Sequence, residues 1–400
     1  MADTVGASLF QNPRFVKLWV GQGISFIGDA FSAVALVIMV AQITGSASAV
    51  GGILVARLLP TLASPLVGVL ADRLDRRVIL VLSDLSRAVL VFGLVFVRDI
   101  VVLYLIAFLL GLARTFFNPT VRAAFPSVVG DGDLTRANAL ISGTFSVSMA
   151  IGPVLGGLVV ATVGLNAAFV FDAITYLVSA GLLSRIALPS PERSAETSFV
   201  RELRSGLSYL KGARVPLTIV VGAFLTILAT NATVPAEIFL AKDTFGSGNA
   251  GYGLLVSLWG GGMVLGSALM AVAGNRVGLM PLYFLSIFAT ALALAGTGLA
   301  PSFVLALSLL TVAGAANGID NVATDTILQE QVPDALLGRV FSIRFLTYSA
   351  GEALAYPAGG LLVDIVGPRS TYLLAGAATA AAGFLIFLVI ALVSRKTLKI

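Results

Sequence analysis

The sequence predicts an all-α membrane protein whose twelve transmembrane helices form two six-helix repeats. Of the 400 residues, 58% are apolar and 11% are charged, whereas soluble domains carry about 25% charged residues. Apolar runs of about 20 residues recur along the chain, and each is long enough to cross the hydrocarbon layer of a bilayer. Residue types also repeat at an offset of 203 positions, which divides the chain into two halves.

Each predicted span is an apolar run bounded by glycine, proline or charged residues. The first half, residues 1–186, contains the spans Phe15–Ile43, Ala49–Leu70, Val78–Val97, Val101–Asn118, Arg136–Thr162 and Ala167–Ile186. The second half, residues 215–400, contains Val215–Leu240, Gly251–Ala273, Pro281–Leu299, Phe303–Asp325, Arg339–Val363 and Thr371–Val393. The first span is too long for a cleaved signal peptide.

The segment 187–214 joins the two halves and is the longest connection. After Pro189 and Pro191 it places Phe199, Leu203, Leu207 and Leu210 on one helical face and charged residues elsewhere. This pattern predicts a cytoplasmic linker with an amphipathic helix lying on the membrane surface. A regulatory or partner-binding role for the helix is the alternative.

The positive charges predict the topology. With a cytoplasmic amino terminus, eighteen Lys and Arg residues lie in inside loops and ends, whereas the outside loops hold Arg98, Lys242 and Arg369. This bias places both termini in the cytoplasm, and we expect a multi-pass protein of the cytoplasmic (inner) membrane. The same distribution explains the net charge of +5 without a nucleic-acid partner.

The internal repeat is clearest over 34 positions. Residues 131–164 and residues 334–367 are identical at twelve positions. The same offset places Asp72-Arg73 on Asn275-Arg276. Because six spans are an even number, the two halves have the same orientation in the membrane.

The loop after the second span carries a recognisable motif. Gly68-Val69-Leu70-Ala71-Asp72-Arg73-Leu74-Asp75-Arg76-Arg77 resembles the signature loop of the major facilitator superfamily, with Asp75 where that family usually has glycine. The resemblance implies the major facilitator fold and a gating latch that includes Gly68, Asp72, Arg73, Asp75, Arg76 and Arg77. The alternative is a positively charged membrane anchor.

A second motif lies in the fifth span. Gly152-Pro153-Val154-Leu155-Gly156-Gly157 resembles the Gly-Pro-x-x-Gly-Gly motif of the exporter branches of that superfamily. Gly152 and Gly156 form a face for close helix packing, and Pro153 removes a backbone donor. Ordinary helix packing is the alternative to an export-specific role.

Further stretches narrow the resemblance. They include Gly28-Asp29, Ser83–Arg87, Asn118–Arg122, Phe171–Tyr176 and Gln329–Pro333. Together they look like the subfamily that contains enterobactin exporters and macrolide or multidrug efflux pumps.

Charged residues within the spans are candidates for proton coupling. The chain contains no histidine and no cysteine, so a proton carried near neutral pH must be bound by a carboxylate. Asp29 lies near the middle of the first span and Arg114 in the fourth, and in the superfamily fold both helices line the central cavity. A permanent structural ion pair between them is the alternative. Glu352 is a second coupling candidate, without an obvious local partner.

Other polar residues predict the substrate cavity. These are Asn231, Glu237, Asn317, Asp320 and Asn321, which lie on spans that line the cavity in the superfamily fold. Glu237 is near the outer end of its span, where we expect hydration. Arg57, Asp84 and Arg87 are more readily interpreted as structural pairs.

The sequence contains no phosphate-binding loop, no nucleophile elbow and no metal cluster, so we expect neither an enzyme nor a bound cofactor or metal. The resemblance implies a secondary transporter, a proton-coupled antiporter that expels hydrophobic or amphiphilic compounds and confers multidrug or antibiotic resistance. A dedicated siderophore or metabolite exporter, a lipid or lysolipid translocator, and a non-transporting sensor remain alternatives. The expected partners are small amphiphilic substrates, protons and membrane lipids, and we expect a monomer.

Overall fold

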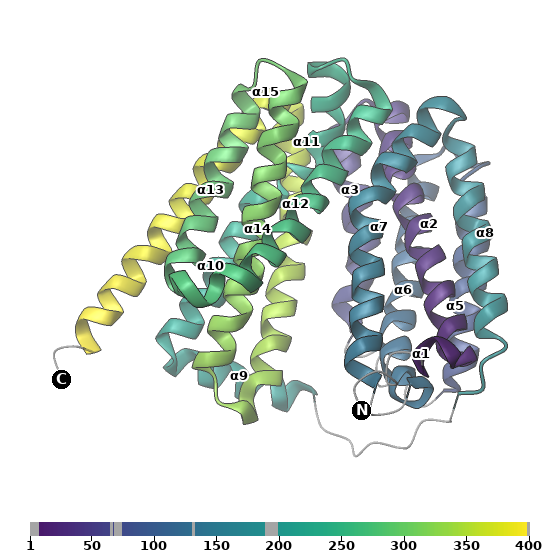
Figure 1. The fold of residues 1–400 in the computed structure, drawn as a ribbon. Helices are drawn as coiled ribbons and strands as arrows, with labels where there is room; N and C mark the ends of the chain where they lie inside the picture. Colours follow the sequence, from purple (N-terminus) through teal and green to yellow (C-terminus); the bar gives the residue numbers. More distant parts are fainter. Residues whose placement is uncertain (1–7, 65–66, 68–73, 130–132, 189–198, 398–400) are drawn as a thin grey trace. The chain divides into compact units, whose positions relative to one another are not determined.

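The computed structural model describes residues 8–64, 67, 74–129, 133–188 and 199–397. All regular structure within these residues is helical (Figure 1). The chain forms two compact units, one of Met1–Ile43 with Ala56–Ala195 and the other of Thr44–Val55 with Glu196–Ile400. The short segment Thr44–Val55 therefore packs with residues of the second half of the sequence.

The first half of the chain forms α1 Ser8–Gln11, α2 Pro13–Thr44, α3 Ala47–Leu58, η1 Leu59–Ala63, α5 Arg76–Gly93, α6 Ile100–Val129, α7 Leu134–Thr162 and α8 Leu165–Leu183. The second half forms α9 Phe199–Gly212, α10 Arg214–Asn231, α11 Val234–Phe239, η3 Leu240–Thr244, α12 Gly248–Val277, α13 Leu279–Leu299, α14 Phe303–Gln331 and α15 Asp334–Thr397.

Nine of the helices in the described ranges are long and apolar enough to cross a membrane. One of them, α15, contains two helices that meet at Gly367, where the backbone is not helical. The apolar helix of α3 and η1 is shorter, and α5 carries four charged residues. This set of helices is consistent with twelve spans and confirms the predicted all-α membrane fold.

Prolines mark two interruptions within the predicted spans. The predicted span Val215–Leu240 lies within one membrane span of the structure, Arg214–Thr244, but its helix is interrupted. Here α10 ends at Asn231 and α11 begins beside Pro235, which lacks an N–H to continue the ladder. Similarly, α3 gives way to a 3-10 turn at Pro60. By contrast, Pro119 lies within α6, which continues past the predicted end of that span to Val129.

Side-chain caps fix several helix starts. The Asp75 carboxylate accepts a hydrogen bond from the Val78 N–H at 3.1 Å, and Asp99 accepts from Val101 N–H at 2.9 Å. Each cap satisfies a backbone donor that has no partner within its helix. The sequence therefore sets the starts of α5 and α6 locally.

Two repeat-related glycines end their helices with positive φ angles. Gly164 follows α7 with φ 109°, and Gly367 divides α15 with φ 82°. Residues with a side chain rarely adopt such angles. The repeat seen in the sequence is thus also a repeat of backbone turns.

The amphipathic helix α9 packs partly against the second unit. Leu210 is 2% exposed in a core cluster that includes Ile343 of α15, and Leu203 packs against the same cluster. The Tyr209 hydroxyl donates to the Gln331 carbonyl at 3.1 Å, whereas Leu207 remains exposed. Part of the apolar face that was expected to lie on the membrane therefore covers protein.

The start of α3 is capped by a carboxylate from α15. Asp364 accepts hydrogen bonds from the Ser46 hydroxyl at 2.9 Å, the Ala47 N–H at 2.8 Å and the Ser48 N–H at 3.0 Å. A carboxylate at a helix amino terminus satisfies unpaired donors and interacts favourably with the helix dipole. This contact anchors the segment Thr44–Val55 in the second unit.

We predict that Asp364→Asn weakens this cap. The substitution removes the charge and one set of acceptor lone pairs. The free energy of local opening at the start of α3 should therefore fall by about 1 kcal/mol, as for the loss of other caps. Hydrogen–deuterium exchange at the Ala47 and Ser48 amides measures this free energy. Asp243→Asn, at an exposed position of the second unit, is the matched control, and equal protection in both variants would contradict the prediction.

Candidate functional site

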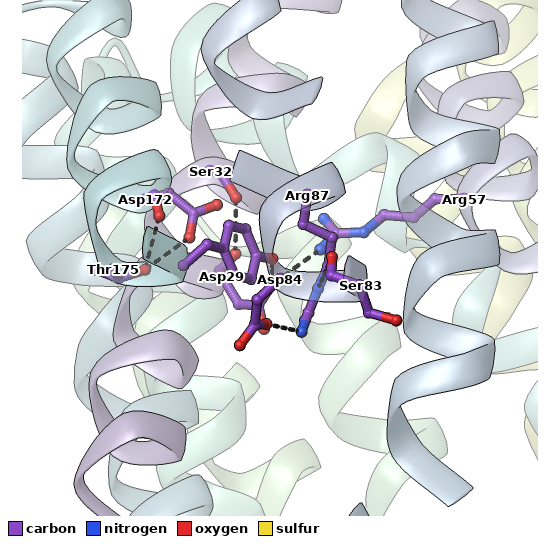
Figure 2. Close-up of polar contacts among 9 residues, drawn as sticks. Asp29, Ser32, Arg57, Ser83, Asp84, Arg87, Asp172 and Thr175 are labelled. Atoms are coloured by element: carbon purple, nitrogen blue, oxygen red, sulfur yellow. Dashed lines mark hydrogen bonds and ion pairs between the residues drawn. The ribbon is translucent and has the colours of Figure 1, made fainter. Parts of the chain in front are cut away.

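Five charged side chains gather inside the first unit (Figure 2). They are Asp29 of α2, Arg57 of α3, Asp84 and Arg87 of α5, and Asp172 of α8. Three carboxylates and two guanidinium groups thus meet within helices whose composition is otherwise apolar. We call these five residues and Tyr176 the charged cluster.

Asp29 has two partners in the charged cluster. Its carboxylate accepts a hydrogen bond from the Tyr176 hydroxyl and lies 3.7 Å from the Arg57 guanidinium. The side chains of Asp29 and Arg57 are 18% and 22% exposed. Asp29 is therefore held by one neutral donor and one cation, while water and small ions still reach it.

Asp84 and Arg87 form a buried ion pair one helical turn apart. Their side chains are 0% and 4% exposed, so neither charge is compensated by water. The Arg87 guanidinium also lies over the rings of Phe117 and Tyr176, at 4.2 and 4.4 Å from their centroids. These contacts add cation–π stabilisation and make Arg87 a fixed part of the packing.

Asp172 is the carboxylate of the charged cluster without a cationic partner. It is fully buried and accepts a hydrogen bond from the Thr175 hydroxyl at 3.2 Å, and none of the ion pairs found in the described part of the chain includes it. Gly28 keeps space for it, because a Cβ at Gly28 would meet Asp172 and Thr175. A buried carboxylate in such surroundings is most stable in its neutral, protonated form.

The second unit contains a polar cavity of about 70 Å³. Four of the five residues predicted for the substrate cavity line it, namely Asn231 of α10 and Asn317, Asp320 and Asn321 of α14. The Asn321 amide donates to the Asn317 carbonyl oxygen at 3.1 Å. The structure therefore brings together polar residues from two helices that are distant in the sequence.

Glu237 is placed differently from the prediction. It lies on α11, is 8% exposed, and is not among the residues that line the cavity. The expectation of a hydrated side chain is therefore wrong, because α11 continues into η3 and packs inside the second unit.

The coupling candidates do not form one group. The ion-pair partner of Asp29 in the described residues is Arg57, where the sequence indicated Arg114, and Arg114 is half-buried on α6. Glu352 does have a local partner, since the Tyr356 hydroxyl donates to it at 3.2 Å. The geometry of Asp29 is thus set by α3 and α8.

The gating motif is described only in part. Gly68, Asp72 and Arg73 lie outside the described residues. Beyond them, Arg76 donates to the Ala123 carbonyl at 3.2 Å and Arg77 to the Ser184 carbonyl. Together with the cap by Asp75, these contacts tie the start of α5 to α6 and to the end of α8.

The Gly-Pro motif lies where α7 approaches α2. A Cβ at Gly152 would meet Ala30, and one at Gly156 would lie 3.0 Å from the Phe31 Cα. Gly157 is also buried, and Pro153 lies inside α7 without ending it. This contact positions the segment of α2 that follows Asp29.

Sequence reasoning missed two residues of the charged cluster. Asp172 and Tyr176 belong to a stretch that was noted only for its resemblance. A carboxylate in the middle of an apolar span is itself a signal of function, and applying that rule to Asp172 identifies it. Tyr176 carries no comparable signal, because tyrosine is common in transmembrane helices.

A solved structure with a similar fold is that of the nucleoside transporter NupG (D323A mutant). Its TM-score is 0.81 at 12% identity, and the match covers 94% of this chain and 99% of the other. At this identity the likeness concerns the fold alone. The apolar helices of the chain agree with a multi-pass membrane protein.

The chain belongs to the transmembrane secretion effector family, which it matches over residues 4–399. It is 29% identical over 362 residues to the putative bacilysin exporter BacE of Bacillus amyloliquefaciens, covering 88% of this chain and 89% of BacE.

Two further relatives are also named as efflux proteins. Macrolide efflux protein A of Streptococcus pyogenes is 24% identical over 377 residues, covering 91% of this chain and 92% of the relative. Enterobactin exporter EntS of Escherichia coli O1:K1 / APEC is 28% identical over 330 residues, covering 81% and 78%. The resemblance to the subfamily of enterobactin exporters and macrolide efflux pumps is therefore confirmed.

We predict that Arg87→Gln strongly destabilises the first unit. The substitution leaves the Asp84 charge buried without a partner, which costs about 3–5 kcal/mol. The double variant Asp84→Asn/Arg87→Gln removes both charges and should regain most of the loss. Thermal unfolding in detergent measures both, with the exposed Arg122→Gln as the control for loss of one positive charge. A double variant as unstable as Arg87→Gln would contradict this account.

Proposed function

We propose that the protein is a proton-coupled exporter of hydrophobic or amphiphilic compounds in the cytoplasmic membrane, with both termini in the cytoplasm. The observation that carries the proposal is the charged cluster, in which three carboxylates lie together with only two guanidinium groups (Figure 2). A chain without histidine needs a carboxylate as its proton carrier, and a purely structural network has no need for the third one. Small amphiphilic substrates, protons and lipids are the proposed partners of a monomer.

Asp29 is the proposed exchange site for the proton. When ionised, it is held by Arg57 and Tyr176. A proton on Asp29 removes the attraction to Arg57, so the guanidinium of α3 is released to water or to cargo. Loss of that proton restores the pair. Because the ion pair joins α2 to α3, protonation of Asp29 weakens the attachment of α3 to α2.

Asp172 is the proposed second proton-binding residue of the charged cluster. It is buried one turn from Tyr176, whose hydroxyl reaches Asp29. With its proton bound, Asp172 leaves the cluster electrically neutral, since the two ionised carboxylates then balance Arg57 and Arg87. Glu352 with Tyr356 is the second proposed coupling site. Arg114 is no longer proposed as the ion-pair partner of Asp29. It is still proposed to contact the cargo.

The cargo class is proposed from the relatives. Their names refer to bacilysin, macrolides and enterobactin, which differ in chemistry but are all exported small molecules. Multidrug efflux with antibiotic resistance follows if this chain accepts several of them. A dedicated metabolite exporter is the second candidate, favoured by the relatives named for a single compound.

A panel in proteoliposomes with an imposed pH gradient separates these candidates. Bacilysin, a macrolide, enterobactin and a lysophospholipid are tested in turn. Uphill transport of several compounds supports multidrug efflux, and transport of one supports a dedicated exporter. Movement of lysophospholipid alone, or of no compound, would contradict the proposed cargo class.

We predict that Asp29→Asn abolishes uphill, gradient-driven efflux, because the amide cannot take up a proton. Transport should fall at least tenfold, while binding of the transported compound stays measurable. The assay is accumulation in proteoliposomes with and without the pH gradient. Asp243→Asn, which removes an exposed carboxylate, should transport as the parent protein does. Unchanged gradient-driven transport in Asp29→Asn would remove Asp29 from the mechanism.

A further inference from the structure

Part of the cavity of the second unit lies at repeat positions of the charged cluster. The offset of 203 residues places Arg87 on Thr290 and Tyr176 on Thr379, and both threonines line the cavity. A guanidinium and a phenol ring in the first unit thus correspond to two small hydroxyl side chains in the second. Side chains smaller than those at the corresponding positions of the first unit thus line part of the cavity.

The hydroxyl groups around the cavity present mainly lone pairs to it. Thr226, Thr230, Thr347 and Thr379 each donate their hydroxyl proton to a backbone carbonyl of their own helix, at 2.8 to 3.1 Å. A hydroxyl has one proton to donate and two lone pairs. With that proton used, each of these oxygens can only accept a hydrogen bond from a ligand.

Two buried atoms of the wall have no partner in the described residues. They are the Asp320 Oδ1 and the Thr324 Oγ1 atoms, and Thr324 is 1% exposed. A buried polar atom without a hydrogen bond is costly. Both residues line the cavity, so a group placed there can satisfy them.

The cavity wall holds one carboxyl group with which a bound cation can pair. Its charged lining residues are Asp320 and Arg344, and Arg344 is paired with Asp325 at 2.7 Å. The guanidinium charge is therefore balanced by Asp325. Asp320 remains as a carboxylate without an ion pair among the residues described.

We propose that this cavity binds the protonated amino group of a cargo molecule, with Asp320 as its counter-ion. An ammonium group has hydrogen-bond donors and no acceptors, which matches the Asp320 carboxylate and the threonine lone pairs of this wall. Trp259 and Tyr348 also line the cavity, and aromatic faces attract cations. Arg344 is the cationic group of the wall and is already paired with Asp325, which disfavours a carboxylate or phosphate.

The size of the cavity limits what enters it. A volume of about 70 Å³ holds a few water molecules, which suits a charged head group but not a bulky compound. The apolar remainder of the cargo must lie outside it. This proposal rests on the proposed export function and adds the chemical class of the cargo, a cationic amphiphile.

Three matched probes test the proposal on the full-length protein in detergent. They are 2-(1-naphthyl)ethylamine, the uncharged 2-(1-naphthyl)ethanol, and the trimethylated quaternary ammonium form of the amine. Isothermal titration should give binding of the amine at least tenfold tighter than of the alcohol. The quaternary form keeps the charge but has no N–H donor, so its affinity should lie between the other two.

Asp320→Asn should weaken binding of the amine about tenfold to a hundredfold, the range that corresponds to one hydrogen-bonded charge, and should leave the alcohol unchanged. Asp334→Asn removes an exposed carboxylate at the start of α15 and should change neither affinity. If Asp320→Asn does not fold, Asp320→Glu keeps the charge and should retain the preference for the amine.

Three results would overturn the proposal. They are equal affinities for amine and alcohol, an amine affinity that Asp320→Asn leaves unchanged, and binding of sodium ions alone that depends on Asp320 while the amine does not bind. If any of these results is obtained and the protein still drives efflux of a cargo without an amine, only the cation-binding proposal is rejected. The export function then remains supported. Absence of all gradient-driven transport would instead reject the export function itself.

Discussion

Every charge inside the helical interior must have a partner, because there is no bulk water to compensate it. In the first unit this constraint centres on Tyr176. Its hydroxyl donates to Asp29, and its ring supports the guanidinium of Arg87, which in turn neutralises Asp84. One side chain of α8 thereby connects α2 with α5. The close packing of Gly152 and Gly156 against α2 depends on that helix being held in place.

The two units meet this constraint in opposite ways. The first unit fills its centre with Arg87 and Tyr176, and its charges are largely paired inside the protein. The second unit has Thr290 and Thr379 at the corresponding positions, and a cavity remains. The two interiors therefore differ although the turns at Gly164 and Gly367 are alike. One interior is filled by paired charges, and the other keeps a polar cavity.

The sequence is a good guide to the helices and a poorer guide to their neighbours. Apolar length and turn residues predict where α2, α7 and α13 lie to within a few residues. The same reasoning finds Asp29, since a carboxylate in an apolar run is conspicuous. It does not find Arg57 as the partner of Asp29, because helical periodicity fixes a face of one helix and says nothing about which helix lies opposite. The burial of Glu237 is missed for the same reason.

Within the proposed mechanism, α3 has a particular importance. Its first residues belong to the second unit, where Asp364 caps them, and its end, with Arg57, belongs to the first. Ten residues separate Ala47 from Arg57, which is about 15 Å along a helix. A proton on Asp29 releases the Arg57 end of this helix, while the other end stays anchored by three hydrogen bonds. The two ends of α3 are thus held by different carboxylates, Asp364 at its start and Asp29 at its end.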